Sequence, residues 1–393
     1  MHPFLTSEHE AFRDTVRRCV RTEITPYAAE WDEAETFPRE LYKKAAAIGM
    51  LGLGFPEEYG GMGGDVFFRV VLSEELSQCG AGGICAGLMS HSIGAPPIAK
   101  FGNAEMKARV LPDILAGEKI SALAITEPSG GSDVAALKTT ARLDGNQYVV
   151  NGSKMFITSG MRADYYSVAV RTGAGDQKAG ASGVSLLLIE RDRTGFTRTP
   201  LQKMGWWASD TAALYFEDVR VPASNLIGEE GKGFKAIMAN FNSERLGMSA
   251  QAIGCAQAAF EDALAWARER HTFGKALIEH QVIRHKLVDM QMKIEAARAY
   301  LYDCAYQVRE AEVVGTPNTS TDTARIAARM AMLKNCATQT MQFCADQAVQ
   351  ILGGAGCMRG SRVERIYREV KVMMIGGGSE EIMKDLAAKQ LGF

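Results

Sequence analysis

A loop rich in hydrogen-bonding groups follows an apolar run in the stretch SALAITEPSGGSD, residues 121–133. The apolar run predicts a short buried strand, and Pro128 excludes a helix directly after it. Gly130 and Gly131 permit backbone angles that other residues avoid, and they let a ligand approach the main chain closely. Together with the hydroxyl group of Ser132, the loop could hold a flat, hydrogen-bond-rich ring or a phosphate. An ordinary turn is the alternative, because clusters of glycine and serine are mostly loops.

Three further positions carry side chains that could take part in chemistry. Glu244, next to Arg245, could act as a general base, although a Glu–Arg pair on the surface of a long helix is the alternative. His91 could also be a base, but its apolar segment favours a hydrogen-bonded histidine in the core. Arg270 could hold a phosphate through charge-assisted hydrogen bonds, or it could be a solvated charge at a helix end.

Residues 1–121 predict an all-α domain that precedes and supports this loop. The first helix is expected over residues 7–30, with Ser7 as its N-cap and Glu10 completing a capping box. Asn103 is expected to cap the last helix of the domain. The other helices are expected over residues 38–49, 65–78, 84–101 and 103–117.

Residues 122–230 predict a β domain, because the apolar periodicity changes and hairpin signals occur. The pairs Asp144–Gly145 and Asn151–Gly152 are typical of two-residue turns between strands. Strands are expected over residues 147–150, 154–158, 165–170, 183–189 and 212–216. The glycine-rich residues 173–183 are expected to form a surface loop.

Residues 231–393 predict a helical bundle. Helices are expected over residues 234–270, 281–311, 321–352, 361–371 and 379–390, with a loop at 315–320. Long amphipathic helices joined by short connections pack as an antiparallel bundle. The predicted fold class is therefore α+β, with an N-terminal helical domain, a central β-barrel or sandwich, and a C-terminal four-helix bundle.

The composition limits the expected partners and compartment. The net charge of −2 over 393 residues gives no reason to expect a nucleic acid or an anionic membrane as a partner. The eight cysteines are scattered without a C-x-x-C pair, so they predict reduced core thiols, and no metal site is expected. No apolar run reaches the roughly 18 residues that a membrane span needs. A bacterial cytoplasm is the expected location, and the mitochondrial matrix is less favoured.

Seven motifs occur in order along essentially the whole chain: FPEEYGG, AITEPSGGSD, NGSKMFIT, SDT…FEDVRVP, RHTFGK, QILGG and GGGSEEIMK. Together they resemble the signatures of the acyl-CoA dehydrogenase family. The resemblance implies FAD, a homotetramer built as a dimer of dimers, and α,β-dehydrogenation of an acyl-CoA thioester with electrons passed to an electron-transfer flavoprotein. Two alternatives remain open: a dehydrogenase or oxidase of carrier-protein-bound acyl groups, and a non-catalytic flavin-binding interaction protein.

The resemblance also implies the residues that would hold FAD. One set would contact the flavin ring: Leu123, Ile125, Thr126, Gly131 and Ser132 on one face and edge, and Phe156 and Thr158 on the other face. Many relatives have tryptophan where Phe156 stands. A second set would hold the diphosphate and adenosine across a subunit boundary: Arg270, Phe273, Gln281, Gln350, Gly353, Gly354, Ser379 and Glu381.

The catalytic base departs from the commonest family pattern. Many members carry a glutamate where this chain has Gly377, which has no side chain to accept a proton. Members similar to isovaleryl-CoA and long-chain acyl-CoA dehydrogenases place the base directly before an arginine on the first bundle helix, which here is Glu244. Glu380 and Glu381 are the rival candidates.

The resemblance assigns the thioester contacts as well. The backbone N–H of Gly377 would donate to the thioester carbonyl, and the other expected substrate contacts are Ser132, Asn242, Arg245 and Gly376. The small side chains at 376 and 377 favour branched or medium-to-long acyl groups over butyryl.

Overall fold

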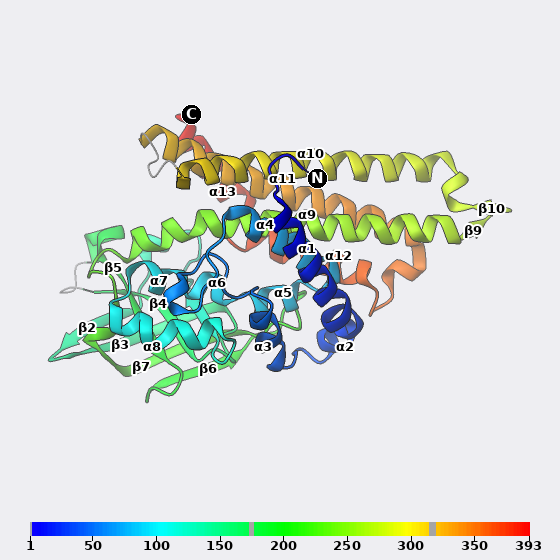
Figure 1. Cartoon of the computed structure of the whole chain (residues 1–393). Helices are drawn as coiled ribbons and strands as arrows, with labels where there is room; N and C mark the ends of the chain where they lie inside the picture. Colours follow the sequence, from blue (N-terminus) through cyan, green and yellow to red (C-terminus); the bar gives the residue numbers. More distant parts are fainter. Residues whose placement is uncertain (1, 173–176, 314–319) are drawn as a thin grey trace.

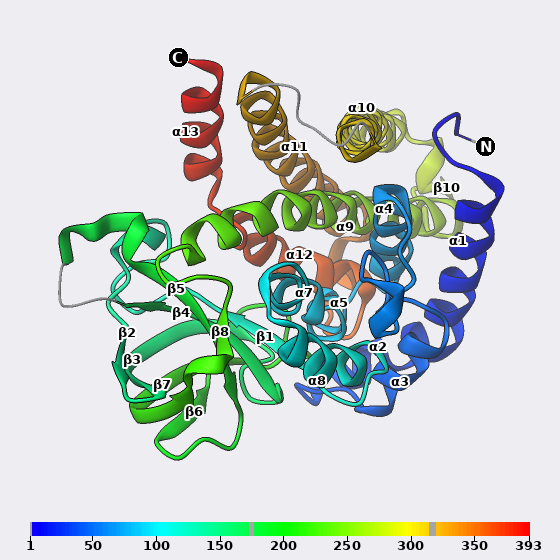
Figure 2. The same cartoon turned by 60° about the vertical axis from the view of Figure 1, so that its left-hand side comes forward.

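The computed structural model describes residues 2–172, 177–313 and 320–393, so the loops expected at 173–183 and 315–320 lie partly outside the described residues. Three long helices lie on one side of the molecule, and the sheet and the N-terminal helices lie next to each other beneath them (Figures 1 and 2). One hydrophobic core joins the N-terminal helices to the sheet, and a second lies inside the helical bundle. No helix among the described residues is long and apolar enough to cross a membrane.

The N-terminal part contains eight α-helices among the described residues: α1 (Ser7–Cys19), α2 (Ala28–Glu33), α3 (Glu40–Ala47), α4 (Val66–Leu76), α5 (Gly82–Leu88), α6 (His91–Gly94), α7 (Pro96–Phe101) and α8 (Ala104–Leu115). Asn103 caps α8 as predicted. Ser7 is not the N-cap of α1. Thr6 takes that place, and the ring of His9 rather than Glu10 completes the capping box.

Two predicted helices are interrupted. The helix expected over 7–30 changes to a π-helical turn at Val20–Ile24 and a 3₁₀ turn at Thr25–Tyr27 before α2 begins. The helix expected over 84–101 is divided into α5, α6 and α7. Pro26 in the first case, and Pro96 at the break between α6 and α7 in the second, lack the N–H group that would continue the helical hydrogen bonds.

The sheet contains eight strands: β1 (Ser121–Ala124), β2 (Thr140–Asp144), β3 (Gln147–Thr158), β4 (Tyr165–Arg171), β5 (Val184–Glu190), β6 (Phe196–Pro200), β7 (Thr211–Pro222) and β8 (Leu226–Ile227). Their order is β6-β7-β3-β2-β4-β5-β8, and β1 pairs in parallel with β4. The Asp144–Gly145 turn between β2 and β3 is confirmed. The Asn151–Gly152 turn is wrong, because β3 continues through it. Gly152, at φ +142, lies at a register shift against β7 and approaches Thr139 too closely for a Cβ atom.

The bundle is built on α9 (Gly233–Glu269), α10 (Gln281–Val313) and α11 (Ser320–Leu352), with α12 (Arg362–Ile375) and α13 (Glu380–Leu391) packed against α11. A small hairpin, β9 (His271–Thr272) with β10 (Lys275–Ala276), joins α9 to α10. This hairpin projects from the end of the bundle that lies farthest from the sheet (Figure 1). The α+β fold predicted from the sequence is confirmed.

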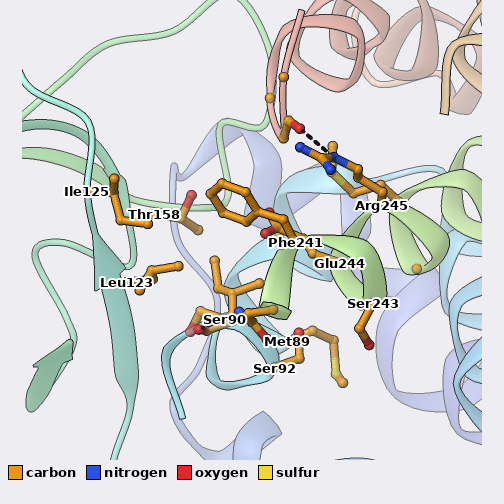
Figure 3. A pocket seen from close by; sticks show the side chains of 18 of the residues that line it. Met89, Ser90, Ser92, Leu123, Ile125, Thr158, Phe241, Ser243, Glu244 and Arg245 are labelled. Atoms are coloured by element: carbon orange, nitrogen blue, oxygen red, sulfur yellow. Dashed lines mark hydrogen bonds between the residues drawn. The ribbon is translucent and has the colours of Figure 1, made fainter. Parts of the chain in front are cut away.

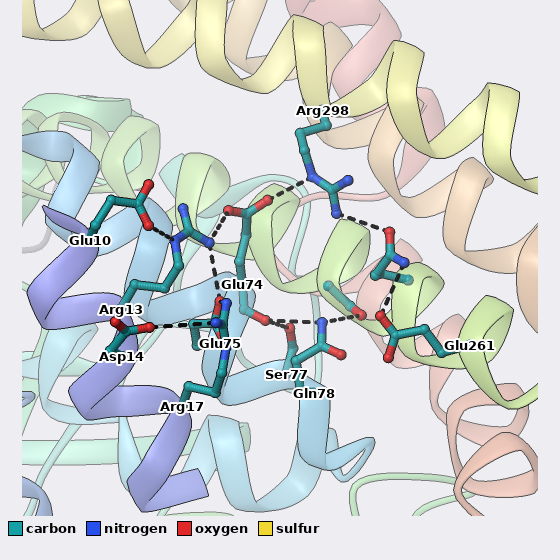
Figure 4. A network of polar contacts seen from close by, with 12 residues as sticks. Glu10, Arg13, Asp14, Arg17, Glu74, Glu75, Ser77, Gln78, Glu261 and Arg298 are labelled. Carbon is teal, nitrogen blue, oxygen red and sulfur yellow. Dashed lines mark hydrogen bonds and ion pairs between the residues drawn. The ribbon is translucent and has the colours of Figure 1, made fainter. Parts of the chain in front are cut away.

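A buried ionic network holds α4 between α1 and α10 (Figure 4). Glu75 accepts hydrogen bonds from Arg13 Nη1 at 3.1 Å and from Arg17 Nη2 at 2.8 Å. Glu74 accepts from Arg298 Nε at 3.0 Å and from the Tyr302 hydroxyl at 2.9 Å. Because buried carboxylates need such partners, the network ties α4 firmly to both neighbours. This matters for the site, since α4 forms part of its wall.

Candidate active site

A cavity of about 1380 Å³ lies where the sheet, the N-terminal helices and the bundle meet. Its walls come from the ends of β1 and β3, from α4 to α7, from the first turns of α9, and from the segment between α12 and α13. The volume exceeds the roughly 300–1,000 Å³ that is typical of a site for one small molecule. The cavity therefore has room for a large ligand or for two ligands together.

The sheet side of the cavity carries every residue predicted to contact a flavin ring. Leu123 and Thr158 face the cavity from β1 and β3, and Ile125 faces it from just after β1 (Figure 3). Thr126, Gly131, Ser132 and Phe156 complete this side. Phe156 has φ +61 and remains 68% exposed, so a large aromatic ring stands uncovered in the wall. Side chains held at positive φ are uncommon and concentrate at functional sites.

A buried ion pair fixes the loop after β1. The Lys154 ammonium, fully buried, donates to Glu127 Oε1 at 2.7 Å and to the Ile125 carbonyl at 3.1 Å. Glu127 also accepts from the backbone N–H groups of Lys138 and Thr139. Burial lowers the pKa of Lys154 to about 8, although Glu127 acts in the opposite direction. Sequence reasoning missed this pair. The signals available were a lysine inside the strand expected over residues 154–158 and a glutamate directly after the apolar run that ends at Ile125.

Glu244 lies on α9 and faces the cavity (Figure 3). Its Oε2 atom is buried and has no hydrogen-bond partner among the described residues. Burial raises the pKa of the carboxyl group to about 7, against the smaller opposing effects of Arg245 and Lys334. A carboxyl group with a pKa near neutrality is suited to removing a proton from a ligand.

The segment from Gly376 to Gly378 forms part of the cavity wall. Gly377 has φ +67, and a Cβ atom there would lie 2.7 Å from the Met248 sulfur, so a side chain at this position would need a strained backbone and a shift of Met248. The N–H of Gly377 has no hydrogen-bond partner among the described residues. Lys334 and Arg245 instead bind the carbonyl oxygens of this segment. A free N–H donor therefore lies on the cavity wall.

Family profiles match all three parts of the chain. The N-terminal, middle and C-terminal domains of acyl-CoA dehydrogenases match residues 6–118, 122–219 and 231–392. A short-chain specific acyl-CoA dehydrogenase of Clostridium acetobutylicum is 40% identical over 97% of both chains. The chain belongs to the acyl-CoA dehydrogenase family. Members of this family are flavin-dependent oxidoreductases.

Other relatives in the acyl-CoA dehydrogenase family differ in the acyl chain that their names specify. A long-chain specific mitochondrial enzyme of Rattus norvegicus is 37% identical over 98% of this chain and 87% of its own length. The crystal structure of a putative acyl-CoA dehydrogenase from Mycobacterium smegmatis superposes with a TM-score of 0.93 at 45% identity, covering 99% of both chains. Similarity to both short-chain and long-chain enzymes leaves the acyl chain length to experiment.

The structure separates the predicted site residues into two groups. Glu244, Arg245, Gly376, Gly377 and Ser379 line the cavity together with the predicted flavin contacts. Asn242 does not line it, but its Oδ1 accepts a hydrogen bond from Arg245 Nη1 at 3.5 Å. The residues predicted to hold the diphosphate and adenosine, other than Ser379, also lie outside the cavity: Arg270, Phe273, Gln281, Gln350, Gly353, Gly354 and Glu381.

The rival candidates for the base lie elsewhere. Neither Glu380 nor Glu381 lines the cavity, and Glu380 Oε1 accepts a hydrogen bond from Lys384 at 2.6 Å. His91 does line it, but the ring is buried, Nε2 lies 3.0 Å from the Leu51 carbonyl, and burial lowers its pKa to about 4. The interpretation of His91 as a hydrogen-bonded core histidine is confirmed. Among the described cavity residues, Glu127, Asp133 and Glu244 are the only carboxylates.

Proposed function

We propose that this protein removes two hydrogens from the Cα–Cβ bond of an acyl-CoA thioester to form the trans-2-enoyl-CoA. The observation that carries the proposal is the unpartnered carboxyl group of Glu244, with its pKa raised to about 7, in the same cavity as the flavin-side residues. Bound against β1 and β3, FAD would accept the hydride from Cβ, which no amino-acid side chain can do. The reaction class is oxidation of a CH–CH group.

The sheet side of the cavity fits the flat ring of FAD. Apolar side chains from β1 and the loop after it, Leu123 and Ile125, provide a surface for a ring face. The hydroxyl groups of Thr126 and Thr158 are placed at the same wall, where ring nitrogens and oxygens need partners. The exposed ring of Phe156 supplies an aromatic surface for the other face. The Lys154–Glu127 pair would keep this arrangement rigid.

The remaining residues would act on the thioester. Glu244 takes the α-proton onto its carboxylate. The free N–H of Gly377 donates to the thioester carbonyl and stabilises the negative charge that develops there, an effect worth about 3 kcal/mol for one such donor. The positive charge of Arg245, close to Gly377, would stabilise the same negative charge on the thioester carbonyl. Ser132, Asn242 and Gly376 are the proposed contacts to the thioester or the pantetheine chain.

A second copy of the chain would complete the FAD site. Phe273 stands at the tip of the β9–β10 hairpin with 98% of its surface exposed and φ +51, so an apolar ring projects from the end of the molecule. Large exposed aromatic side chains are typical of interfaces. We propose that this hairpin, with Arg270 and Gln281, reaches the diphosphate of FAD in a neighbouring subunit of a homotetramer. Gln350, Gly353, Gly354, Ser379 and Glu381 are the proposed contacts to the rest of the nucleotide.

The proposed electron acceptor is an electron-transfer flavoprotein. Support comes from a solved structure described as the electron transferring flavoprotein of Acidaminococcus fermentans. One of its chains is 36% identical to this protein and superposes with a TM-score of 0.92. A prolyl acyl carrier protein oxidase, AnaB, is also similar, at 28% identity and a TM-score of 0.88. Carrier-bound acyl groups are therefore compared with acyl-CoA thioesters in the test below.

The test is anaerobic mixing of the FAD-loaded protein with acyl-CoA thioesters of increasing length and branching, followed by the loss of flavin absorbance. We expect one chain class to bleach the flavin rapidly. Glu244→Gln should slow bleaching by about 10²–10⁴-fold, the usual contribution of a general base, while FAD stays bound. Glu380→Gln, which removes a carboxylate outside the cavity and outside the proposed FAD contacts, is the matched control for bleaching. Bleaching only by carrier-bound acyl groups, or undiminished bleaching in Glu244→Gln, would contradict the proposal.

A further inference from the structure

Arg69 on α4 lines the same cavity, on the side formed by the N-terminal helices. Its Nη1 atom donates to the Ser243 hydroxyl at 2.6 Å. Gly54, at φ +74, makes space for the guanidinium group, since a Cβ atom there would lie 1.8 Å from Nη2. Contacts with two elements therefore define the position of the Arg69 side chain: α9, and the loop that contains Gly54.

The charge of Arg69 is not compensated. Within the described residues, no carboxylate lies within 4 Å of its guanidinium group, and Ser243 is its one hydrogen-bond partner. Burial lowers the pKa of Arg69, and Glu312 opposes this effect without forming an ion pair with it. Three other arginines that are largely withdrawn from solvent outside the cavity have carboxylate partners: Arg13 with Glu75, Arg362 with Asp262, and Arg368 with Asp32. Arg365 is buried more deeply and has none, but its guanidinium group donates to the carbonyl oxygens of Gly80 and Gly360.

A half-buried guanidinium group with neither a carboxylate nor a carbonyl partner is a candidate site for an anion. Arginine does not lose its proton in proteins, so burial cannot be relieved by neutralisation. The cavity around it is mainly apolar, with Val66, Val70 and Leu76 of α4 in the wall. Nε and Nη2 make no hydrogen bond within the described part of the chain, and these two groups form a planar fork that matches a carboxylate.

The position of Arg69 relative to the proposed base indicates which part of a ligand it would contact. Its partner Ser243 directly precedes Glu244 on α9. In Figure 3, Ser243 lies toward Met89 and Ser92, whereas the flavin-side residues Leu123 and Ile125 lie across the cavity. Arg69 is thus close to the reacting region but on the side opposite the sheet, where an acyl chain would extend past the base.

We propose that Arg69 binds a carboxylate at the far end of the acyl chain, so that the substrate is the monothioester of a dicarboxylic acid. This inference rests on the proposed function, because it names the substrate class of the same site. A phosphate of CoA would satisfy the same guanidinium chemistry. The two anions are distinguished by comparing thioesters that share CoA and chain length and differ in the terminal group.

The experiment is anaerobic flavin bleaching with matched pairs: pentanoyl- and glutaryl-CoA, hexanoyl- and adipoyl-CoA, octanoyl- and suberoyl-CoA. In the native protein, the ω-carboxyl member of at least one pair should react with the higher kcat/KM. Arg69→Leu should lower kcat/KM for that thioester by about 10- to 100-fold, the usual effect of losing a charged hydrogen bond, and leave its uncharged partner within a few-fold. Arg69→Lys should retain part of the preference. Arg309→Leu is the control, since Arg309 packs on Phe67 of α4 but does not line the cavity.

The outcomes separate the two proposals. If uncharged thioesters bleach the flavin and no ω-carboxyl thioester is preferred, the Arg69 inference is wrong and the proposed function stands. Equal losses for both members of a pair in Arg69→Leu would assign the guanidinium group to CoA or to folding, and this also overturns the inference. If no thioester of either kind bleaches the flavin, both proposals fail. If Arg69→Leu does not fold, the comparison within the native protein still tests the substrate class, and loss of the preference in Arg69→Lys tests the residue.

Discussion

Lys334 provides the most demanding test of the proposed site. This lysine lies on α11, is fully buried, and donates to the carbonyl oxygens of Met374 at 2.6 Å and Gly378 at 2.7 Å. These oxygens lie on either side of Gly376 and Gly377, so one ammonium group spans the segment that presents the free N–H. Burial lowers the pKa of Lys334 to about 8. The lysine is therefore expected to position the segment rather than to contact the thioester.

Lys334→Met keeps most of the side-chain volume and removes both hydrogen bonds and the charge. Two charge-assisted hydrogen bonds are worth about 1.5–3 kcal/mol each, and part of this loss is offset because an ammonium group no longer has to be buried. If the segment loosens enough for the Gly377 N–H to lose its orientation, the rate of flavin reduction should fall by about 10²-fold, the effect of one lost donor to a developing negative charge. The loss should appear mainly in kcat.

The same substitution should also move the pH dependence. Lys334 is one of the two positive charges that lower the pKa of Glu244. Without it, the pKa of Glu244 should rise above about 7, and the rate should reach its plateau at a higher pH. A purely structural loss of activity would not produce this shift.

The assay is rapid anaerobic mixing with a reactive thioester across pH 5.5 to about 9, the range around the expected pKa of Glu244. FAD content and denaturant unfolding are measured in parallel. Lys384→Met is the matched control, because Lys384 is an exposed lysine of α13 that pairs with Glu380. A Lys334→Met protein that binds FAD and shows the native rate and the native pH profile would refute the reasoning.

Four further predictions concern the base, the buried pair and the hairpin. In the native protein, kcat/KM for flavin reduction should rise about tenfold per pH unit below pH 7 and level off above it, because Glu244 must be ionised to accept the proton. Between pH 4.5, the ordinary pKa of a glutamate, and about pH 7, Glu244 keeps its proton in the folded state but loses it in the unfolded state. The contribution of Glu244 to stability should therefore decline as pH rises through this window. In urea unfolding, Glu244→Gln should be more stable relative to the native protein at pH 8 than at pH 5. Lys154→Met should lower the free energy of unfolding by about 3–5 kcal/mol, because Glu127 is left buried without its partner. Urea unfolding measures this change, and a free energy of unfolding within about 1 kcal/mol of the native value would contradict the prediction. Phe273→Ala should weaken FAD retention on gel filtration without changing the far-UV spectrum, and unchanged retention would remove the hairpin from the proposed FAD site.

Local features of the chain were predictable because they depend on neighbouring residues. Asn103 is recognisable as a helix cap, and Asp144–Gly145 as a turn, from the chemistry of a few adjacent positions. The same reasoning was wrong at Asn151–Gly152, where pairing with β7 keeps the strand extended through a turn-like sequence. It was also wrong at Ser7, because Thr6 and His9 together satisfy the helix end.

The chemistry of the site was only partly predictable for the same physical reason. The positions of Glu244 and Gly377 could be chosen from motifs, but the sequence cannot show that Glu244 lacks a partner or that Met248 occupies the space beside Gly377. Unpaired charge at Arg69 is likewise invisible in the sequence. Residue types and their local order determined the elements and the candidate groups. The tertiary structure alone decided their charge and pKa, because burial and partner distances come from segments hundreds of residues apart.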